Sequence, residues 1–476
     1  MTRQVKILLA VFTACLLGIV VNLTWIQLLG SERISGNAAN KRRLVEEYAV
    51  ERGDIISADG QVVARSVDTG GEYRYQREYP LGPLFANVTG YDSWKYGRTG
   101  VEKEYNAELL GRGPRLTFRS IANGLLGASK KGDSVVLTVD SRLQRAAADA
   151  LGDSTGAVVA MNPRTGAVLA MVTSPTYDPN STVPVPGRDT GAEWAAINAN
   201  PGKPLLDRCL LGLYPPGSSF KVVTAAAALD SGVATPGSEF DCEGKLEVSG
   251  FTLYDFSRSG HGRIDLARAL VVSCNVTFAQ VGLLVGAQTL VSYAEAFGFN
   301  NAIPFDLPVA RSHIQKADTM DPVALAASAI GQAEDIATPL QMAMVAAAVA
   351  NDGVAPKPYL VSEFRDYNGK IVEQFRPGEW REVMDGETAS VLTGMMVEAV
   401  EDGTGTAARI DGVEVAGKTG TAETGVPGAG PHAWFICFAP ALDPEVAVAV
   451  VVENGGEGGK VAAPIARDVL ERALEL

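Results

Sequence analysis

The chain has 476 residues, of which 46% are hydrophobic, and its formal net charge is −14. This length exceeds one ordinary domain and predicts two or three, with enough apolar residues for sizeable cores. The acidic balance argues against nucleic-acid binding, which requires a basic surface, so no nucleic-acid partner is expected.

The N-terminus predicts a membrane anchor. No charged residue lies between Ile7 and Leu29, and about 20 apolar residues are enough to cross a bilayer as a helix. The run is too long for the core of a signal peptide and no cleavage site follows it directly, so we expect an uncleaved signal anchor. Basic residues flank it on both sides, so the positive-inside rule does not decide its orientation.

Residues 31–130 differ from the remainder in sequence character, being more charged and irregular, and they contain no recognisable catalytic motif. Segments 51–56 and 59–64 predict two short strands around an Asp-Gly turn, and segment 100–106 predicts a helix. We therefore expect a small mixed α/β domain, a pedestal or dimerisation-like module. The predicted domains are 1–30 for the cytoplasmic tip and anchor, 31–130 for the pedestal, and 131–476 for a catalytic domain.

The third predicted domain contains strands first, helices in the middle and strands at the end. This order predicts an α+β fold in which one antiparallel five-stranded sheet is flanked by helices. Mostly apolar strand runs indicate that both faces of the sheet are covered. Strands are expected at 135–139, 157–161, 167–172, 413–417, 434–438 and 446–453, and helices at 141–151, 218–231, 264–273, 276–286, 321–330, 338–351, 387–401 and 464–474.

Segment 214–221 reads Tyr-Pro-Pro-Gly-Ser-Ser-Phe-Lys and precedes an Ala-rich apolar run. A turn before such a run predicts the start of a helix, with Ser218 in its first turn. Residues three apart share one helix face, so Lys221 lies one turn behind Ser218. An amine kept neutral by a dry site can take the proton of a hydroxyl, which predicts a nucleophilic serine with a lysine base. Taken alone, the pattern fits a capping serine and a solvated lysine better.

Two further motifs favour the nucleophilic serine over the capping serine. Ser273-Cys274-Asn275 lies between two apolar helical segments, and Lys418-Thr419-Gly420-Thr421 lies just after an expected strand. S-x-x-K, S-x-N and K-T-G in this order are typical of penicillin-recognising enzymes with an active-site serine. Each motif is weak alone, and together they favour Ser218 over its neighbour Ser219 because only Ser218 stands three residues before the lysine.

Acyl transfer explains why these residue types should come together. Attack on an amide carbonyl needs a deprotonated hydroxyl, which Ser218 with Lys221 supplies. A proton must reach the leaving amine, which Ser273 can relay, and an amide such as Asn275 can hold the substrate peptide. We therefore predict that Ser218, Lys221, Ser273, Asn275 and Lys418 are catalytic.

The last motif suits the carboxylate end of a substrate, because it offers a cation and hydroxyl groups. Thr419, Gly420 and Thr421 are predicted to bind substrate, with Gly420 allowing close approach to the strand. The backbone N–H groups of Ser218 and Thr421 are predicted to form the oxyanion hole. No cofactor is expected.

With these motifs in place, the chain resembles the class B penicillin-binding proteins, which are monofunctional peptidoglycan transpeptidases. The resemblance covers nearly the whole chain, including Arg52-Gly53-Asp54-Ile55 and Gly100-Val101-Glu102 of the pedestal. Within that class it is greatest to an actinobacterial group with a short pedestal. Two positions depart from common family patterns: Gly331-Gln332-Ala333 ends in alanine where glycine is frequent, and Cys274 stands where some relatives have aspartate.

This resemblance implies D,D-transpeptidation. Ser218 would be acylated by the penultimate D-Ala of one stem peptide with release of the terminal D-Ala, and an amine of a neighbouring stem would take the acyl group. It also implies acylation by β-lactams, a single membrane span, an extracytoplasmic catalytic domain, and a separate glycosyltransferase or divisome proteins as partners.

Other functions compete with this interpretation. Segment 412–419 matches the phosphate-binding loop G-x-x-x-x-G-K-[ST], but its middle predicts a strand and no helix can follow it. A Ser-His-Asp hydrolase is disfavoured because no G-x-S-x-G elbow surrounds Ser218. On the same fold, a D,D-carboxypeptidase, a β-lactam-binding sensor and a non-catalytic scaffold of a wall-synthesis complex remain alternatives.

Cysteine spacing predicts no metal site. The chain has five cysteines and 3 histidines, without a C-x-x-C pair. Outside the cytoplasm a disulfide among Cys209, Cys242, Cys274 and Cys437 and a set of buried free thiols are equally compatible with the sequence. Cys274 could pair with Cys242 or Cys209.

Overall fold

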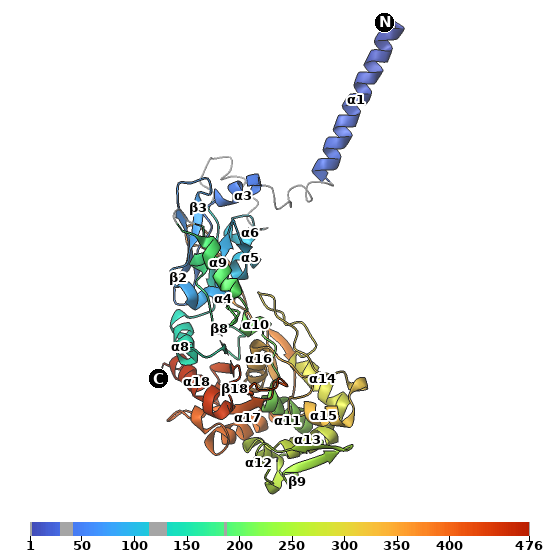
Figure 1. The fold of residues 1–476 in the computed structure, drawn as a ribbon, viewed down its shortest axis with the longest axis vertical. Helices are drawn as coiled ribbons and strands as arrows, with labels where there is room; N and C mark the ends of the chain where they lie inside the picture. Colours follow the sequence, from blue (N-terminus) through green and yellow to red (C-terminus); the bar gives the residue numbers. More distant parts are fainter. Residues whose placement is uncertain (1, 29–40, 114–130, 185–187, 476) are drawn as a thin grey trace.

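The computed structural model describes residues 2–28, 41–113, 131–184 and 188–475, and Figure 1 shows its elongated shape. The N-terminal helix α1 (Arg3–Leu28) confirms the expected apolar segment, although Leu29 lies outside the described residues. Its stretch Arg3–Asn22 has a mean hydropathy of 2.3 and buries no residue against the rest of the chain. By length and composition it is a candidate membrane span.

The predicted five-stranded sheet is confirmed and all its pairings are antiparallel. Val158 and Ala160 face one apolar core, whereas Ala157 and Val159 face another. Because successive strand residues point to opposite faces, the sheet is buried on both sides, as its apolar runs predict. The strand order is β17 (Ala416–Ala422), β18 (His432–Ala439), β19 (Val446–Val452), β7 (Gly156–Met161) and β8 (Val168–Ser174).

Helices cover both faces of this sheet. Helices α8 (Ser141–Leu151) and α18 (Gly458–Ala473) pack together on one face, and α16 (Pro339–Ala350) packs on the other. Every residue of α16 is buried, which suits its run of Ala, Val and Met. The other helices of this part, which Figure 1 shows gathered around α11, are α11 (Lys221–Asp230), α12 (Leu266–Val271), α13 (Asn275–Val285), α14 (Ala287–Phe297), α15 (Pro322–Ser328) and α17 (Gly386–Glu401).

A second, six-stranded sheet joins the pedestal to the remainder of the chain. Strands β1 (Ile55–Ile56) and β2 (Val62–Asp68) form the predicted hairpin, and β1 also pairs in parallel with β6 (Ser134–Leu137). The remaining pairings are antiparallel, so the sheet is mixed. Its other strands are β3 (Tyr75–Glu78), β14 (Val361–Arg365) and β15 (Ile371–Gln374). Strands from distant parts of the sequence therefore build one sheet.

Short elements complete the two parts. The pedestal helices are α3 (Lys41–Tyr48), α4 (Ala86–Thr89), α5 (Gly100–Glu104) and α6 (Asn106–Leu109), with strands β4 (Asp92–Ser93) and β5 (Gly97–Arg98). Elsewhere lie α9 (Thr190–Ala199), α10 (Arg208–Leu211), β9 (Glu239–Cys242), β10 (Lys245–Val248), β11 (Phe251–Tyr254), β12 (Gly262–Asp265), β13 (Val354–Pro356) and β16 (Glu379–Glu382).

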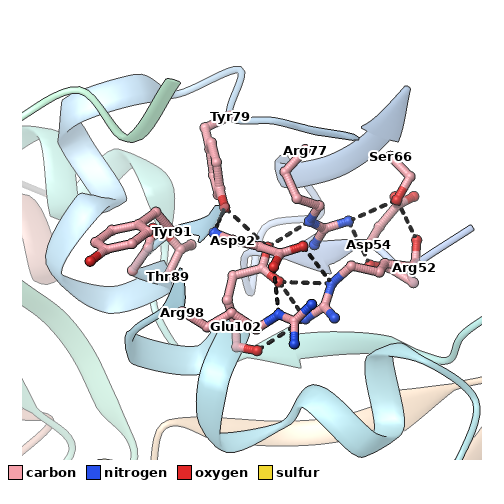
Figure 2. A network of polar contacts seen from close by, with 12 residues as sticks. Arg52, Asp54, Ser66, Arg77, Tyr79, Thr89, Tyr91, Asp92, Arg98 and Glu102 are labelled. Atoms are coloured by element: carbon pink, nitrogen blue, oxygen red, sulfur yellow. Dashed lines mark hydrogen bonds and ion pairs between the residues drawn. The ribbon is translucent and has the colours of Figure 1, made fainter. Parts of the chain in front are cut away.

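Buried charges hold the pedestal together (Figure 2). The carboxylate of Glu102 accepts hydrogen bonds from Arg52 Nη2 at 2.7 Å and from Arg77 Nε at 2.6 Å. Arg98 donates to Asp92 Oδ1, which also accepts the hydroxyl of Tyr48 at 2.8 Å. Buried charges are tolerated only when they are paired, so these residues must stay together for the module to fold.

Four segments differ from the sequence-based expectations. The strand expected at 135–139 forms as β6, but it pairs in the six-stranded sheet and not in the five-stranded one, because its partners are β1 and β14. The strand expected at 413–417 is displaced: β17 runs from Ala416 to Ala422, so the K-T-G motif lies within a strand and not after it. Helix α14 was not expected as a separate element. The last helix begins at Gly458 and contains Pro464, where the expected start lay.

Candidate active site

Ser218 lies in the short 3-10 turn η3 (Gly217–Phe220), immediately before α11. The turn is shaped by Gly217, which has φ +53° and donates a backbone hydrogen bond to Gly331 O at 2.9 Å. A left-handed φ favours glycine because it has no Cβ. Ser218 is half-buried, and its neighbour Ser219 is buried with its hydroxyl bonded to Pro216 O at 2.6 Å. Of these two serines, only Ser218 therefore lines the two hollows that are described below.

Lys221 opens α11 and its side chain is fully buried. Its Nζ donates to Ser273 O at 2.6 Å and to Asn275 Oδ1 at 2.7 Å, and lies 3.3 Å from Ser273 Oγ. Among the contacts of the described residues, Lys221 Nζ does not hydrogen-bond Ser218 Oγ. Hydrogen bonds of Lys221 therefore connect the S-x-x-K motif to the S-x-N motif.

The third motif reaches the same cluster from β17. Lys418 is fully buried, and its Nζ donates to Ser273 Oγ at 2.8 Å and to Thr419 O at 3.1 Å. Ser273 Oγ therefore lies between two lysine amines. A hydroxyl in this position can accept a proton from one side and donate from the other, as a relay requires.

Burial controls the protonation of both lysines. Loss of hydration lowers the pKa of Lys221 to about 7. Burial, with the charge of Lys221 as the second cause, lowers the pKa of Lys418 well below its ordinary value. An apolar environment disfavours the ammonium form, so a neutral amine is available near neutral pH. A lowered pKa of this kind is what the predicted role of Lys221 as a base requires.

The S-x-N turn joins α12 to α13. Ser273 has φ +59°, a left-handed conformation that is uncommon outside glycine. The strained residue turns the chain between the two helices, and Asn275 begins α13 with its backbone N–H bonded to Asp255 Oδ1 at 2.9 Å. Asp255 was not predicted, because no sequence signal connects it to the motif.

Strand β17 presents the predicted substrate-binding hydroxyls. Thr419 Oγ1 lies 2.6 Å from Thr404 Oγ1, and Thr421 Oγ1 accepts a hydrogen bond from Gly458 N at 3.4 Å. Thr404 precedes the strand in sequence and was not predicted. A Cβ on Gly420 would lie 2.9 Å from Pro216 O and 3.2 Å from Ser219 N. The glycine lets the strand approach the turn that carries Ser218.

Two hollows meet at Ser218. One, of about 760 Å³, is bordered by Asn275 and Thr421 and by the apolar side chains of Phe251, Tyr254 and Val426. The other, of about 420 Å³, is lined by hydroxyl groups of Ser273, Thr404, Thr406, Thr419 and Thr421, with Lys460. A hydroxyl-rich hollow suits a carboxylate, and the apolar one suits the body of a peptide.

The loop Gly331-Gln332-Ala333, which departs from the common family pattern, packs against the turn that carries Ser218. Gly331 has φ +71°, and a Cβ there would lie 2.2 Å from Gly217 O. Ala333 also has a left-handed φ, of +66°, where glycine would be unstrained. The loop thus supports the turn of Ser218, a role that the sequence does not reveal.

The rival phosphate-loop interpretation does not fit this geometry. Lys418 and Thr419 lie in the middle of a strand paired with β18, and Ala422 ends that strand without a following helix. A phosphate loop requires a helix N-terminus after the lysine. Segment 412–419 therefore matches the phosphate-loop motif in sequence but not in structure.

All five cysteines are free thiols in the structure. Cys209 Sγ lies 3.1 Å from Val172 O, while Cys274 Sγ lies 3.2 Å from Cys242 Sγ. Cys274 therefore faces Cys242 and not Cys209. His261 and Asp255 lie beside this pair, which places four potential metal ligands next to the S-x-N turn.

Comparison with known families identifies the class. A family described as "Penicillin binding protein transpeptidase domain" matches residues 156–471, and one described as "Penicillin binding protein A dimerisation domain" matches residues 52–135. The chain belongs to the penicillin-binding proteins with a transpeptidase domain. This confirms the predicted family and fold class.

Within this family, the chain is similar to proteins named PbpA over nearly its whole length. Peptidoglycan D,D-transpeptidase PbpA of Mycolicibacterium smegmatis is 39% identical over 99% of this chain and 98% of its own length. The protein of the same name from Mycobacterium tuberculosis is 38% identical over 96% of both chains. The ceftriaxone acyl-enzyme of penicillin-binding protein A from M. tuberculosis has a TM-score of 0.87 and 38% identity, covering 90% of this chain and all of that one. The expected similarity to the actinobacterial PbpA group is confirmed.

Proposed function

We propose that this chain is a peptidoglycan D,D-transpeptidase that forms an acyl-enzyme on Ser218 and is acylated by β-lactams at the same residue. One observation carries the proposal most strongly: Lys221, Ser273 and Lys418, from three separate motifs, are hydrogen-bonded in one buried cluster beneath the groove that Ser218 lines. The names of the full-length relatives support the same reaction.

In the proposed acylation, neutral Lys221 accepts the proton of Ser218 Oγ as the oxygen attacks the carbonyl of the penultimate D-Ala. The contact between these two side chains forms when substrate enters, since catalytic hydrogen bonds are often longer in free enzymes. The backbone N–H groups of Ser218 and Thr421 stabilise the developing oxyanion. The proximity of β17 to the turn supports this, because a Cβ on Gly217 would lie 2.9 Å from Thr421 O.

Collapse of the tetrahedral intermediate releases the terminal D-Ala. In the proposal, its amine receives a proton through Ser273 Oγ, which is in contact with both lysine amines. Lys418 and the hydroxyls of Thr419 and Thr421 hold the substrate carboxylate, with Thr404 supporting Thr419. Asn275 holds the peptide chain, and Gly420 keeps the strand close to Ser218. An amine from a second stem then takes the acyl group by the reverse sequence.

The nucleophile is tested by labelling full-length protein with a fluorescent penicillin. Wild-type protein should label stoichiometrically, Ser218→Ala should not label, and Lys221→Ala should label at least about a hundredfold more slowly, as expected on loss of a general base. Ser219→Ala is the matched control because its hydroxyl bonds the backbone and should leave labelling within a few-fold of wild type. Labelling of Ser218→Ala would overturn the choice of nucleophile.

The transferase is distinguished from a hydrolase by the fate of the acyl group. A donor peptide ending in D-Ala-D-Ala is offered with and without an amine acceptor, and the products are identified by mass spectrometry. A transpeptidase should give the peptide-linked product and little hydrolysis. Hydrolysis regardless of acceptor would favour the D,D-carboxypeptidase, and acylation only by β-lactams would favour the sensor. If neither the donor peptide nor a β-lactam acylates the protein, the non-catalytic scaffold would be favoured.

We further propose that α1 is a single-pass anchor and that the catalytic part lies outside the cytoplasm, where peptidoglycan is found. A membrane-impermeant maleimide applied to intact cells that carry the Cys15→Ser, Ser257→Cys variant should label position 257, because the other four native cysteines are buried. Labelling only after lysis would reverse the orientation.

The proposed division remains 1–30 for the tip and anchor, 31–130 for the pedestal and 131–476 for the catalytic domain. Because no glycosyltransferase domain is expected in a pedestal of this size, a separate polymerase or divisome protein is proposed as partner. Mild-detergent copurification should recover it, and its absence under several detergents would argue against the partnership.

A further inference from the structure

A carboxylate at the end of β19 contacts the segment that leads into Ser218. Glu453 directly follows this strand, and its Oε1 atom accepts two hydrogen bonds. Arg208 Nε donates one at 2.7 Å, and the hydroxyl of Tyr214 donates the other at 2.8 Å. The proposed acyl transfer assigns no role to these three residues, here called the Glu453 anchor.

The Glu453 anchor is sheltered from solvent. The side chains of Arg208 and Glu453 are 4% and 23% exposed, and Tyr214 is buried. Arg208 also donates to the carbonyl oxygens of Gly202 at 2.7 Å and Lys203 at 3.3 Å, so its guanidinium is held on more than one side. Buried charges are costly unless they are paired, and a charged acceptor makes a stronger hydrogen bond than a neutral one. The carboxylate is therefore a firm point of attachment for the Tyr214 hydroxyl.

Tyr214 begins the Tyr-Pro-Pro-Gly segment that precedes Ser218. Its backbone N–H donates to Ala337 O at 3.0 Å, and its carbonyl oxygen accepts the N–H of the same residue at 2.8 Å. The next carbonyl, Pro215 O, accepts a hydrogen bond at 2.9 Å from Nε1 of Trp434, a fully buried residue of β18. The rings of Tyr214 and Trp434 meet edge to face, with centroids 6.1 Å apart. The segment is therefore attached to the sheet by its backbone and by its tyrosine side chain.

The strand register brings the Glu453 anchor close to the level of Thr421, one of the two proposed oxyanion-hole donors. Thr421 pairs with Ala433 on β18, and Ala433 pairs with Val452 on β19. Glu453 is the next residue along the chain. The hydrogen-bonded ladder of the sheet therefore continues, through the anchor, into the turn that carries Ser218, the other proposed donor. The two N–H groups are connected through the protein as well as facing the same groove.

We propose that Glu453 is a positioning residue, which fixes the turn of Ser218 through the hydroxyl of Tyr214 and so sets the alignment of the oxyanion hole. This inference rests on the proposed acyl transfer at Ser218. The donors of an oxyanion hole lower the barrier only when they are aimed at the place where negative charge develops. A displacement of about 1 Å in a catalytic group can lower a rate by roughly a hundredfold. The Glu453 anchor itself touches no reacting atom.

The hydroxyl of Tyr214 separates a positioning role from a purely structural one. Tyr214→Phe keeps the ring contact with Trp434. It also leaves Glu453 paired with Arg208, so the thermal midpoint should fall by no more than about 5 °C. The substitution removes only the bond that ties the turn to the carboxylate, so a change in the acylation rate reports on the position of the turn.

The experiment mixes full-length protein in detergent micelles with increasing concentrations of a penicillin. Rapid quenching gives the first-order acylation constant at saturation and the concentration at half saturation. Tyr214→Phe should lower the first-order constant about five- to twentyfold and leave the half-saturating concentration within about twofold of wild type. Alignment of the oxyanion hole acts on the transition state and not on binding of the intact ligand, which is why the two quantities should separate.

Variants of Glu453 test the other end of the same bond. Glu453→Ala should lower the first-order constant at least as much as Tyr214→Phe, and Glu453→Gln should recover part of the rate because it keeps an acceptor oxygen. The double variant with Tyr214→Phe and Glu453→Ala should be within about threefold of Glu453→Ala alone, since both changes remove one shared bond. Tyr214→Phe keeps the test informative if loss of the partner of buried Arg208 prevents folding.

Tyr293→Phe is the matched control, because the hydroxyl of Tyr293 also donates to a carboxylate, that of Asp230 at the opposite end of α11 from Lys221. It should acylate within about twofold of the wild-type rate. A wild-type rate in Tyr214→Phe, an equal loss in Tyr293→Phe, or a change confined to the half-saturating concentration would each overturn the positioning role. A wild-type protein that no penicillin acylates would instead overturn the proposed function on which this role rests.

Discussion

Asn275 Oδ1 accepts a hydrogen bond from Lys221 Nζ at 2.7 Å, so a neutral amide holds the amine that is proposed to act as the base. A carboxylate at the same distance would stabilise the ammonium form and keep the proton on Lys221. An amide at this position therefore adds no negative charge that would oppose the lowering of the Lys221 pKa by burial.

The first prediction concerns the pH dependence of wild-type acylation. Burial lowers the pKa of Lys221 to about 7. Only the neutral amine can accept a proton, so the active fraction rises as pH increases through that value. The second-order rate constant for penicillin acylation should increase about tenfold per pH unit below the pKa and level off above it. Stopped-flow fluorescence between pH 5.5 and 9 measures this, and a flat profile would exclude Lys221 as the base.

Asn275→Asp should move that profile. The new carboxylate would lie beside Lys221 Nζ and raise the lysine pKa by roughly one to three pH units. Acylation at pH 7 should then fall by about tenfold or more and recover at higher pH. Asn275→Ala serves as the control, because it removes the amide without adding charge and should lower the rate without the same alkaline displacement. Equal profiles for the two variants would contradict the proposed electrostatic role.

The loop behind Ser218 permits a pair of substitutions with opposite effects. Gly331→Ala places a Cβ 2.2 Å from Gly217 O and should destabilise the fold by about 1–3 kcal/mol while slowing acylation. Ala333→Gly relieves a left-handed alanine and should stabilise the fold by up to about 1 kcal/mol. Thermal unfolding and penicillin acylation are measured for both. A stabilised Gly331→Ala protein would show that the close approach is unimportant.

The pedestal network gives a stability prediction independent of catalysis. Glu102→Ala leaves Arg52 and Arg77 without their shared buried carboxylate and should cost about 3–5 kcal/mol of folding free energy. Glu78→Ala removes the partner of Arg65 in an exposed pair and should leave the folding free energy close to that of the wild type. Chemical denaturation compares the two. Similar losses would mean that burial does not set the importance of these pairs.

Much of the fold could be predicted because its strands are strongly apolar. Strands β7, β18 and β19 follow continuous runs of Ala, Val, Ile and Phe, which read as strands covered on both faces. Strand β17 was placed too early because Gly417 and Gly420 weaken its β propensity. Its full hydrogen-bonding ladder to β18 determines its extent. Helix α14 follows α13 after Gly286 alone, in a segment where no helix was expected.

The motif residues could be identified because each lies within a short, ordered pattern. Thr404, Asp255 and Gly331 could not, since each contributes through contacts with residues far away in sequence. The group formed by Cys242, Asp255, His261 and Cys274 has the same character, because its members have no regular spacing and meet only when the β9–β12 segment folds against α13.

The six-stranded sheet makes the two parts of the molecule mechanically inseparable. Its strands β14 and β15 come from the middle of the chain, and β6 pairs with β1 on one side and β14 on the other. A fragment cut at residue 131 would lose β1–β3 and leave β6 with an open hydrogen-bonding edge, a template for aggregation. Asp306 adds a second connection between the two parts, because it accepts hydrogen bonds from both Tyr105 and the backbone of Val361.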